Sequence, residues 1–311
     1  MSNKFKHVAV LMGGLSAEHD VSIMSGEEVV KILNELGYKV SIIDPKEDFA
    51  IKLAEVKPDV VFNALHGTYG EDGAIVGVLE TMKIPYTHSG IMASAIGINK
   101  RMTREIVASR GVKVAPGKVV TLEEVVEASK AKEGLFPKPY VIKPVQQGSS
   151  LGVHIIKEGD NFQFDYKDWK YGNQLLIEEF IPGKELSVAY FNGRALGVLE
   201  LRPKVKFLDY EAKYTDGVTD HIFPAEIPED VYKKALKYAE VVHEALGCRT
   251  VSRCDFRYNE NQGSEGLYFL EINTHPGLTK YSMVPDLILR VGLTMKDLVE
   301  QLISDAKYEI N

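Results

Sequence analysis

Residues 1–90 alternate short Val- and Ile-rich runs with apolar repeats at helical spacing, and this alternation limits the folds open to the chain. The three predicted strands cover residues 7–12, 39–43 and 59–65. Two sets of apolar residues recur every three or four positions: Val29, Ile32, Leu33 and Leu36, then Ile75, Val78, Leu79 and Met82. Strands separated by helices predict a parallel sheet with right-handed crossovers. We therefore expect an α/β domain whose glycine turns open at the carboxyl edge of the sheet, where ligands bind in such folds.

The bulk properties of the chain exclude several classes of protein. At 311 residues it can bury a large core, and we expect two or three domains. A net charge of −7 without a long basic run argues against a nucleic-acid partner. Two cysteines are too few for a disulfide framework. The apolar run at residues 8–12 is too short for a signal peptide or a membrane span, so we expect a cytoplasmic protein without a membrane partner.

The pattern changes after about residue 95. Five strands are predicted at 140–144, 152–157, 175–180, 185–191 and 195–201, the last two joined by an Asn192-Gly193 hairpin turn. Helices are predicted at about 100–110, from Thr121, at 229–246 and at 294–304, and Thr121 and Glu124 suit a capping box. Residues 203–228 are polar and aromatic without a period, and a segment of that length is typical of a functional or mobile loop.

Two further strands, 250–258 and 267–273, are predicted on either side of a polar, glycine-bearing segment that suits a hairpin. Alternation along each strand places Arg253 with Asp255, and Glu271 with Asn273, on one face. Pairing the strands would bring together two carboxylates, an amide oxygen and a guanidinium. Oxygen-only ligands suit Mg²⁺ that carries nucleotide phosphates. The alternative is a surface hairpin with scattered charges.

Glycine turns follow the first and third predicted strands. Gly13-Gly14 opens the first helix without a G-x-G-x-x-G fingerprint, and Glu18 stands where a phosphate would have to approach. That carboxylate would repel phosphate but hold an ammonium group; alternatively, it complements the helix dipole. After the third strand, His66 precedes three closely spaced glycines, which indicate backbone held near a ligand. A lone histidine at a strand end is more often a structural group than a catalyst.

Two segments of the middle region suit a nucleotide. Lys143 ends a strand and precedes a loop of glycine and serine that offers hydrogen-bond donors to phosphate. No helix follows, so the loop is not a Walker A motif, and an ordinary hairpin is the alternative. Residues 178–185 run from a strand through an extended linker into the next strand. Backbone groups of such a linker can pair with the edge of adenine, and Glu185 can accept ribose hydroxyls.

Six segments of the chain, taken in order, resemble one family. They are GGLSAEHDVS, HGTYGEDG, VIKPVQQGSSLGV, DYEAKY, RCDF and EINTHPGLTKYSMVP, and they are similar to segments of the ATP-grasp superfamily and, within it, of the D-alanine–D-alanine ligases. The resemblance runs from Val8 to about Leu298. It implies a three-domain ATP-grasp fold, α+β overall, with a Rossmann-like N-terminal parallel sheet and ATP held between the other two domains. We place the domains at 1–97, 98–184 and 185–311, with the metal site and a lid at 203–228 in the last.

The resemblance also implies the role of each site residue. ATP would contact Lys100, Lys143, Ser150 and Lys213, with adenine at Glu178, Glu179, Phe180 and Ile181 and the ribose at Glu185. Two Mg²⁺ ions, with Mn²⁺ as a substitute, would be held by Asp255, Glu271 and Asn273. The ammonium group of the first D-alanine would bind Glu18, within a hydrogen-bonded set that includes Ser149 and Tyr214. The oxyanion hole would consist of Arg253 and the Gly277 N–H. Further substrate contacts would come from His66, Met283 and Ser282, the last to the carboxylate of the second D-alanine.

A few positions depart from the family pattern, and none of them holds an assigned role: Val76, Gln146, Gln147, His275 and Leu278. By resemblance, the reaction would join two D-alanines through an acylphosphate, release ADP and phosphate, and serve peptidoglycan precursor synthesis in a homodimeric enzyme. The alternatives are another carboxylate–amine ligase of the superfamily, a D-alanine–D-lactate ligase, a silent nucleotide-binding module and a Rossmann dehydrogenase. A silent module would lack a metal ligand or Arg253, and a dehydrogenase would need the missing fingerprint.

Tyr214 discriminates between a peptide and an ester product. Ester-forming members of the family typically carry a histidine near this position, and a protonated histidine would repel the ammonium form of a second amino acid. Tyrosine is neutral near pH 7, so we expect D-alanyl-D-alanine as the product. His221, in the same segment, is the residue that would favour the ester.

Overall fold

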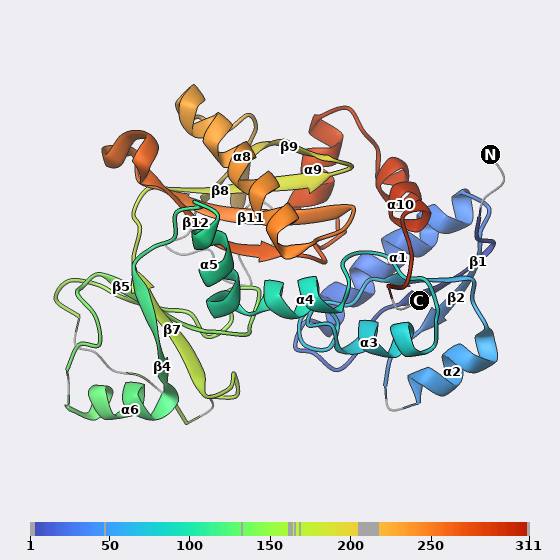
Figure 1. Cartoon of the computed structure of the whole chain (residues 1–311), viewed down its shortest axis with the longest axis horizontal. Helices are drawn as coiled ribbons and strands as arrows, with labels where there is room; N and C mark the ends of the chain where they lie inside the picture. Colours follow the sequence, from blue (N-terminus) through green and yellow to red (C-terminus); the bar gives the residue numbers. More distant parts are fainter. Residues whose placement is uncertain are drawn as a thin grey trace.

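The predicted parallel sheet forms the N-terminal part of the molecule (Figure 1). The computed structural model describes residues 4–309 except 47, 132, 161–163, 165, 168 and 205–217. β1 (His7–Leu11), β2 (Lys39–Ile43) and β3 (Val60–Asn63) pair in parallel in the order β2-β1-β3. α1 (His19–Glu35) and α3 (Ala74–Thr81) correspond to the two predicted helical repeats. The predicted Rossmann-like sheet is therefore confirmed, and α2 (Phe49–Val56) is an addition to it.

A four-stranded antiparallel sheet occupies the middle of the chain. Its order is β4-β7-β5-β6, with β4 (Gly117–Thr121), β5 (Tyr140–Pro144), β6 (His154–Ile156) and β7 (Gln174–Glu179). α6 (Leu122–Ala131) starts at the predicted capping box: the Glu124 carboxylate accepts the Thr121 N–H at 2.6 Å, and the Glu124 N–H donates to Thr121 Oγ1 at 3.2 Å. The sheet and α6 enclose a hydrophobic core of their own.

The second antiparallel sheet has five strands in the order β10-β9-β8-β11-β12. They are β8 (Lys184–Phe191), β9 (Arg194–Pro203), β10 (Thr219–Ile222), β11 (Val251–Tyr258) and β12 (Leu267–Asn273). α8 (Glu229–Leu246) covers one face, together with α5 (Lys100–Ser109), and α9 (Met283–Arg290) and α10 (Met295–Ser304) follow the last strand. The mixed fold class, with one parallel and two antiparallel sheets, is confirmed.

Part of the predicted loop at 203–228 belongs to this sheet. β10 pairs antiparallel with β9, so Thr219–Ile222 lie in a strand and not in a loop without structure. The correction has a physical reason: β10 is short and polar and gains its structure from hydrogen bonds to the edge of β9. Lys213 and Tyr214 lie outside the described residues, as does the rest of 205–217.

One hydrophobic core joins the N-terminal sheet to the five-stranded sheet. Val29 and Leu33 of α1 pack in the same cluster as Leu298 and Leu302 of α10. The end of the chain continues this contact, since the Glu309 N–H donates to both carboxylate oxygens of Glu80 at 2.8 and 2.9 Å. Figure 1 shows α10 beside α1, with the two ends of the chain on the same side of the molecule.

Gly26 of α1 sets the distance between this helix and the segment after β1, because a Cβ at this position would lie 2.5 Å from Cβ of Met12. Gly26→Ala should lower the free energy of unfolding by about 1–3 kcal/mol through overpacking. Gly77→Ala in α3 is the matched control: its methyl would meet only Ile91 Cδ1, at 3.9 Å, and should stabilise by about 0.5–1 kcal/mol through helix propensity. Thermal melting compares the two variants. Equal losses would contradict the close approach of α1.

Candidate active site

Two adjoining cavities lie between the three sheets. The first is lined by Glu18, His66, Lys100, Ser149, Arg253, Glu271, Asn273, Gly277, Ser282 and Met283, among others. The second lies between the two antiparallel sheets and is lined by Lys100, Lys143, Ser150, Glu178, Glu179, Phe180, Ile181, Glu185, Asp255 and Glu271, among others. Lys100 and Glu271 line both. Every predicted site residue within the described part of the chain therefore lines one of these two adjoining cavities.

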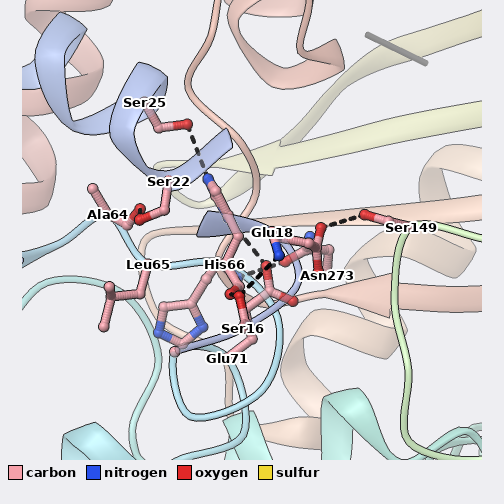
Figure 2. Close-up of polar contacts among 12 residues, drawn as sticks. Ser16, Glu18, Ser22, Ser25, Ala64, Leu65, His66, Glu71, Ser149 and Asn273 are labelled. Carbon is pink, nitrogen blue, oxygen red and sulfur yellow. Dashed lines mark hydrogen bonds and ion pairs between the residues drawn. The ribbon is translucent and has the colours of Figure 1, made fainter. Parts of the chain in front are cut away.

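Glu18, at the start of α1, is the buried carboxylate of the first cavity. Ser149 Oγ donates a hydrogen bond to it across the cavity, from the loop after β5, as Figure 2 shows. The Glu18 N–H donates to Ser16 Oγ at 3.1 Å. Gly67 lies close to this carboxylate: a Cβ there would be 2.7 Å from Glu18 Oε2, and its φ of +70° favours glycine. The predicted Glu18–Ser149 hydrogen bond is thus present.

His66 is held through both ring nitrogens, with Ser25 Oγ 2.9 Å from Nε2 and Glu71 Oε1 3.2 Å from Nδ1 (Figure 2). This fixed orientation agrees with the prediction that a histidine at a strand end is a structural group, although the ring also lines the cavity. Glu71 is a cavity residue that sequence reasoning missed. A Cβ at Gly148 would lie 3.8 Å from Glu18 Oε2 and 4.0 Å from Glu71 Oε2. Two buried carboxylates so placed suit an ammonium group.

The hairpin of β11 and β12 has the register that the sequence pattern requires. Asp255 stands opposite Glu271, and Arg253 stands opposite Asn273. Arg253 Nη2 and Nε bind both carboxylate oxygens of Asp255, at 2.7 to 3.1 Å. Glu271 pairs with Lys100 at 3.0 Å. The two acids are therefore each neutralised by a cation.

The donor atoms of this hairpin fit a hard cation. Asp255 and Glu271 supply carboxylates on adjacent strands, and Asn273 supplies an amide oxygen that also accepts the His275 N–H at 2.7 Å. The described residues contain no group of three or more His, Cys, Asp or Glu that could hold a metal, because the third ligand here is an amide. An all-oxygen set with two negative charges is what Mg²⁺ prefers.

Lys143 is positioned by a buried ion triad beneath the second cavity. Glu178 Oε1 lies 2.5 Å from Lys143 Nζ, and Glu178 Oε2 lies 2.6 Å from Arg104 Nη1. Arg104 also donates to the carbonyl of Ala115. The Glu178 side chain therefore pairs with two cations, whereas the family resemblance implies that it contacts adenine. Arg104 was missed because a charged residue on an amphipathic helix resembles a surface group.

Arg257 shapes the linker after β7. Its Nε donates to the carbonyl of Ile181 at 3.0 Å, and Nη2 donates to the carbonyl of Gly183 at 2.8 Å. Nη1 lies 3.5 Å from Glu185 Oε2. Burial lowers the pKa of Arg257 from its ordinary value, although Glu185 opposes this effect. Arg257 lies two positions after Asp255 on the same face of β11, and this alternation could have revealed it.

Gly277 and Ser282 close the far end of the first cavity. A Cβ at Gly277 would lie 2.7 Å from Ser282 Oγ, so the backbone approaches the serine closely. Ser282 precedes α9 and its hydroxyl is 2.9 Å from Thr279 Oγ1. His221 lies elsewhere, on β10, with Nδ1 2.8 Å from Asp286 Oδ2. Burial raises the pKa of Asp286, but hydrogen bonds from His221 and Arg290 outweigh it and leave that pKa below its ordinary value.

A cleft between two antiparallel sheets, lined by lysines and by paired acids on one hairpin and joined to a parallel α/β domain, defines an ATP-grasp enzyme. The comparisons with known proteins agree. The family described as D-ala D-ala ligase C-terminus matches residues 106–304, and its N-terminus counterpart matches residues 46–89. A D-alanine–D-alanine ligase of Rhizorhabdus wittichii is 48% identical over 305 residues, which is 96% of each chain.

Two solved structures are also similar over nearly the whole chain. The D-alanine–D-alanine ligase from Bacillus anthracis complexed with ATP has a TM-score of 0.76 and 29% identity, with 97% of each chain covered. The VanG D-Ala:D-Ser ligase from Enterococcus faecalis has a TM-score of 0.76 and 26% identity, with 97% of this chain and 99% of that one covered. The chain belongs to the D-alanine–D-alanine ligase family. None of its described helices is both long and apolar enough to span a membrane.

Glu178→Gln removes the one anion of the buried triad and leaves Lys143 and Arg104 uncompensated. We expect a loss of about 3–5 kcal/mol in the free energy of unfolding, because each side chain of the triad is at most one-tenth exposed. The KM for ATP should also rise. Glu226→Gln is the control, since its pair with Arg202 lies on the surface and should contribute about 1 kcal/mol or less. Thermal melting and ATP titrations measure both effects. Equal effects from the two variants would refute a positioning role for Glu178.

Proposed function

We propose that the two cavities form one active site, with ATP in the second cavity and two D-alanines in the first. As a member of its family, the protein is an ATP-dependent ligase that joins two D-alanines into D-alanyl-D-alanine for peptidoglycan precursor synthesis. The observation that carries the proposal is the shared wall of the cavities at Lys100 and Glu271. A phosphate that reaches this wall from the second cavity would meet a substrate carboxylate in the first.

On the nucleotide side, Lys143 and Lys100 would contact the phosphates and Ser150 would donate to them. The linker at 179–181 would bind adenine, and Glu185 would bind the ribose. Glu178 would orient Lys143 through the ion pair between them. Asp255, Glu271 and Asn273 would hold two Mg²⁺ ions, or Mn²⁺ in their place. When bound, such ions supply charge neutralisation to the phosphates. Lys213, in the segment outside the described residues, would reach the γ-phosphate.

On the substrate side, Glu18 would hold the ammonium group of the first D-alanine, with Ser149 and Tyr214 completing the hydrogen-bonded set. The carboxylate of this substrate takes the γ-phosphoryl group and becomes an acylphosphate, and ADP leaves. The free amine of the second D-alanine attacks the acyl carbon, a tetrahedral oxyanion forms, and phosphate departs. Arg253 and the Gly277 N–H would stabilise that oxyanion. His66, Ser282 and Met283 would position the substrates, with the Ser282 hydroxyl on the second carboxylate.

The remaining proposals concern the assembly. We place domain boundaries near residues 97 and 184, and a lid in the segment 203–228 outside β10. We also propose a homodimer in the cytoplasm, as the family resemblance implies. Light scattering on the purified chain tests the dimer, and a monomeric mass at all concentrations would refute it.

Asp255→Ala and Glu271→Ala should each remove nearly all turnover. Each substitution removes an oxygen ligand of the metal ions, so the phosphate charge loses the cations that neutralise it. Retention of more than about a tenth of the parent activity, a difference of less than ~1.4 kcal/mol, would contradict the metal assignment. Asp220→Ala is the control, since this acid lies on β10, is half-exposed, and pairs with the half-exposed Lys204, so that its loss should change activity little. Binding of Mn²⁺, followed by electron paramagnetic resonance, measures loss of the metal, and thermal melting of the same variants shows whether the fold is retained.

The product should be D-alanyl-D-alanine when D-alanine and D-lactate compete at equal concentration at about pH 6 and about pH 8. The physical reason is that Tyr214 is neutral and does not repel a second amino acid. His221 pairs with Asp286 and does not line either cavity. Adding D-serine to the panel tests the second substrate accepted by the similar ligase from Enterococcus faecalis. Mass spectrometry identifies the products. A dominant ester at pH 6 that disappears in His221→Gln would reverse the assignment.

A further inference from the structure

Four enclosed side-chain nitrogens of three residues behind the active-site loop have no hydrogen-bond partner within the part of the chain that the structure describes. They are His88 Nε2, His275 Nε2, and Nε and Nη2 of Arg249. The two histidines are only 3% and 1% exposed. Buried donors are almost always satisfied in folded proteins, so each exception requires an explanation. Four exceptions on three residues of one region call for a common explanation.

The three residues come from both sides of the interface between the N-terminal sheet and the five-stranded sheet. His88 follows the strand-like segment at Tyr86, and its ring centroid lies 5.1 Å from that of His275. Arg249 precedes β11, and its backbone N–H donates to Ser89 Oγ at 3.2 Å. The guanidinium lies over the Tyr86 ring at 4.6 Å, and Nη1 donates to the carbonyl of Lys307 at 3.1 Å. These contacts leave Nε and Nη2 without an acceptor.

The hydrogen-bond partners of the histidines allow both Nε2 atoms to act as donors. Thr87 Oγ1 accepts the Asn63 N–H at 3.1 Å, so its own hydrogen is available for His88 Nδ1, 3.0 Å away. A ring that accepts at Nδ1 carries its proton on Nε2. The Thr274 hydroxyl lies 3.0 Å from His275 Nδ1 and can donate to it as well. With the proton on Nε2 of both rings, the cluster presents N–H groups and one guanidinium charge.

His88 also holds a strained backbone. Its φ of +69° lies in the left-handed region, which glycine adopts far more readily than a branched or bulky residue. Strain of this kind persists where the side chain has a role that the surrounding structure enforces. The ring is enclosed beside Phe62 and His275. A glycine would satisfy the backbone here, so the imidazole itself is what the position supplies.

We propose that His88, Arg249 and His275 form a buried binding site for a small monovalent anion of the chloride class. A cation is excluded because the enclosed groups are donors and one carries a positive charge. A water molecule fits less well, since it accepts two hydrogen bonds and must place two hydrogens on acceptors. A halide accepts from several donors at once and neutralises Arg249. The anion would tie the segment 87–89 to the loop in which the His275 N–H holds Asn273 Oδ1.

Crystals of the full chain grown without chloride and soaked in bromide test the site directly. We expect an anomalous bromine peak within hydrogen-bond distance of His88 Nε2, His275 Nε2 and Arg249. A water molecule in its place, or no density, would overturn the proposal. The experiment involves neither ATP nor D-alanine, so its result is independent of the proposed active site.

Thermal melting supplies the second test, at constant ionic strength with sodium gluconate replaced stepwise by sodium chloride or bromide. The parent should show a saturable rise of about 2–4 °C, the size expected for a bound ligand of moderate affinity. Arg249→Gln should abolish the rise. His88→Gly should also abolish it while relieving the left-handed strain, which keeps the test valid if Arg249→Gln does not fold. Lys233→Gln, an exposed cation on α8, is the control and should retain the rise. An equal rise in all four proteins would refute the site.

Discussion

The antiparallel register of β11 and β12 is the constraint on which the site depends. It places Asp255 directly opposite Glu271, and two carboxylates on neighbouring strands repel each other unless a cation intervenes. Arg253 pairs with Asp255, and Lys100 pairs with Glu271. Lys100 comes from α5, outside the sheet, so neutralising the hairpin also fixes a helix against it. A slip of one residue in the register would turn the side chains of one strand to the opposite face of the sheet, and the carboxylates would no longer lie side by side.

Ligand binding in the cleft would require an exchange of ion-pair partners. Its cations are already paired in the structure: Lys143 with Glu178, Lys100 with Glu271, and Arg253 with Asp255. Buried charges require such partners, because an unpaired ion in this environment would be strongly destabilising. Phosphates and a divalent cation would therefore compete with existing ion pairs, and the net gain from binding is the difference between two sets of contacts. Arg104 matters here, because it would keep Glu178 neutralised if Lys143 turned to a phosphate.

The sequence predicted most of the sheets and the acids of the hairpin, because alternation along a strand determines which side chains share a face. It did not predict α4 (Ile91–Ile98), which is apolar on nearly all sides and so lacks the polar face that marks a helix. β10 was missed because it is short and depends on its neighbour. Arg104 acquires its role only through a contact distant in sequence, with Glu178. Glu71 acquires its role through the fold of the loop that turns it back to His66. The roles of Lys213 and Tyr214 stay predictions.

The shared core of the N-terminal and five-stranded sheets has a mechanical consequence. The chain leaves the N-terminal sheet, forms the two antiparallel sheets, and then returns to pack α10 and its last described residues against the N-terminal part. Separating these two parts would expose a continuous apolar core, whereas the four-stranded sheet encloses a core of its own. The three sheets are therefore held by unequal contacts: two share a core, and the third packs on a core of its own. Most residues that line the first cavity belong to the part with the shared core, whereas the second cavity lies between that part and the four-stranded sheet.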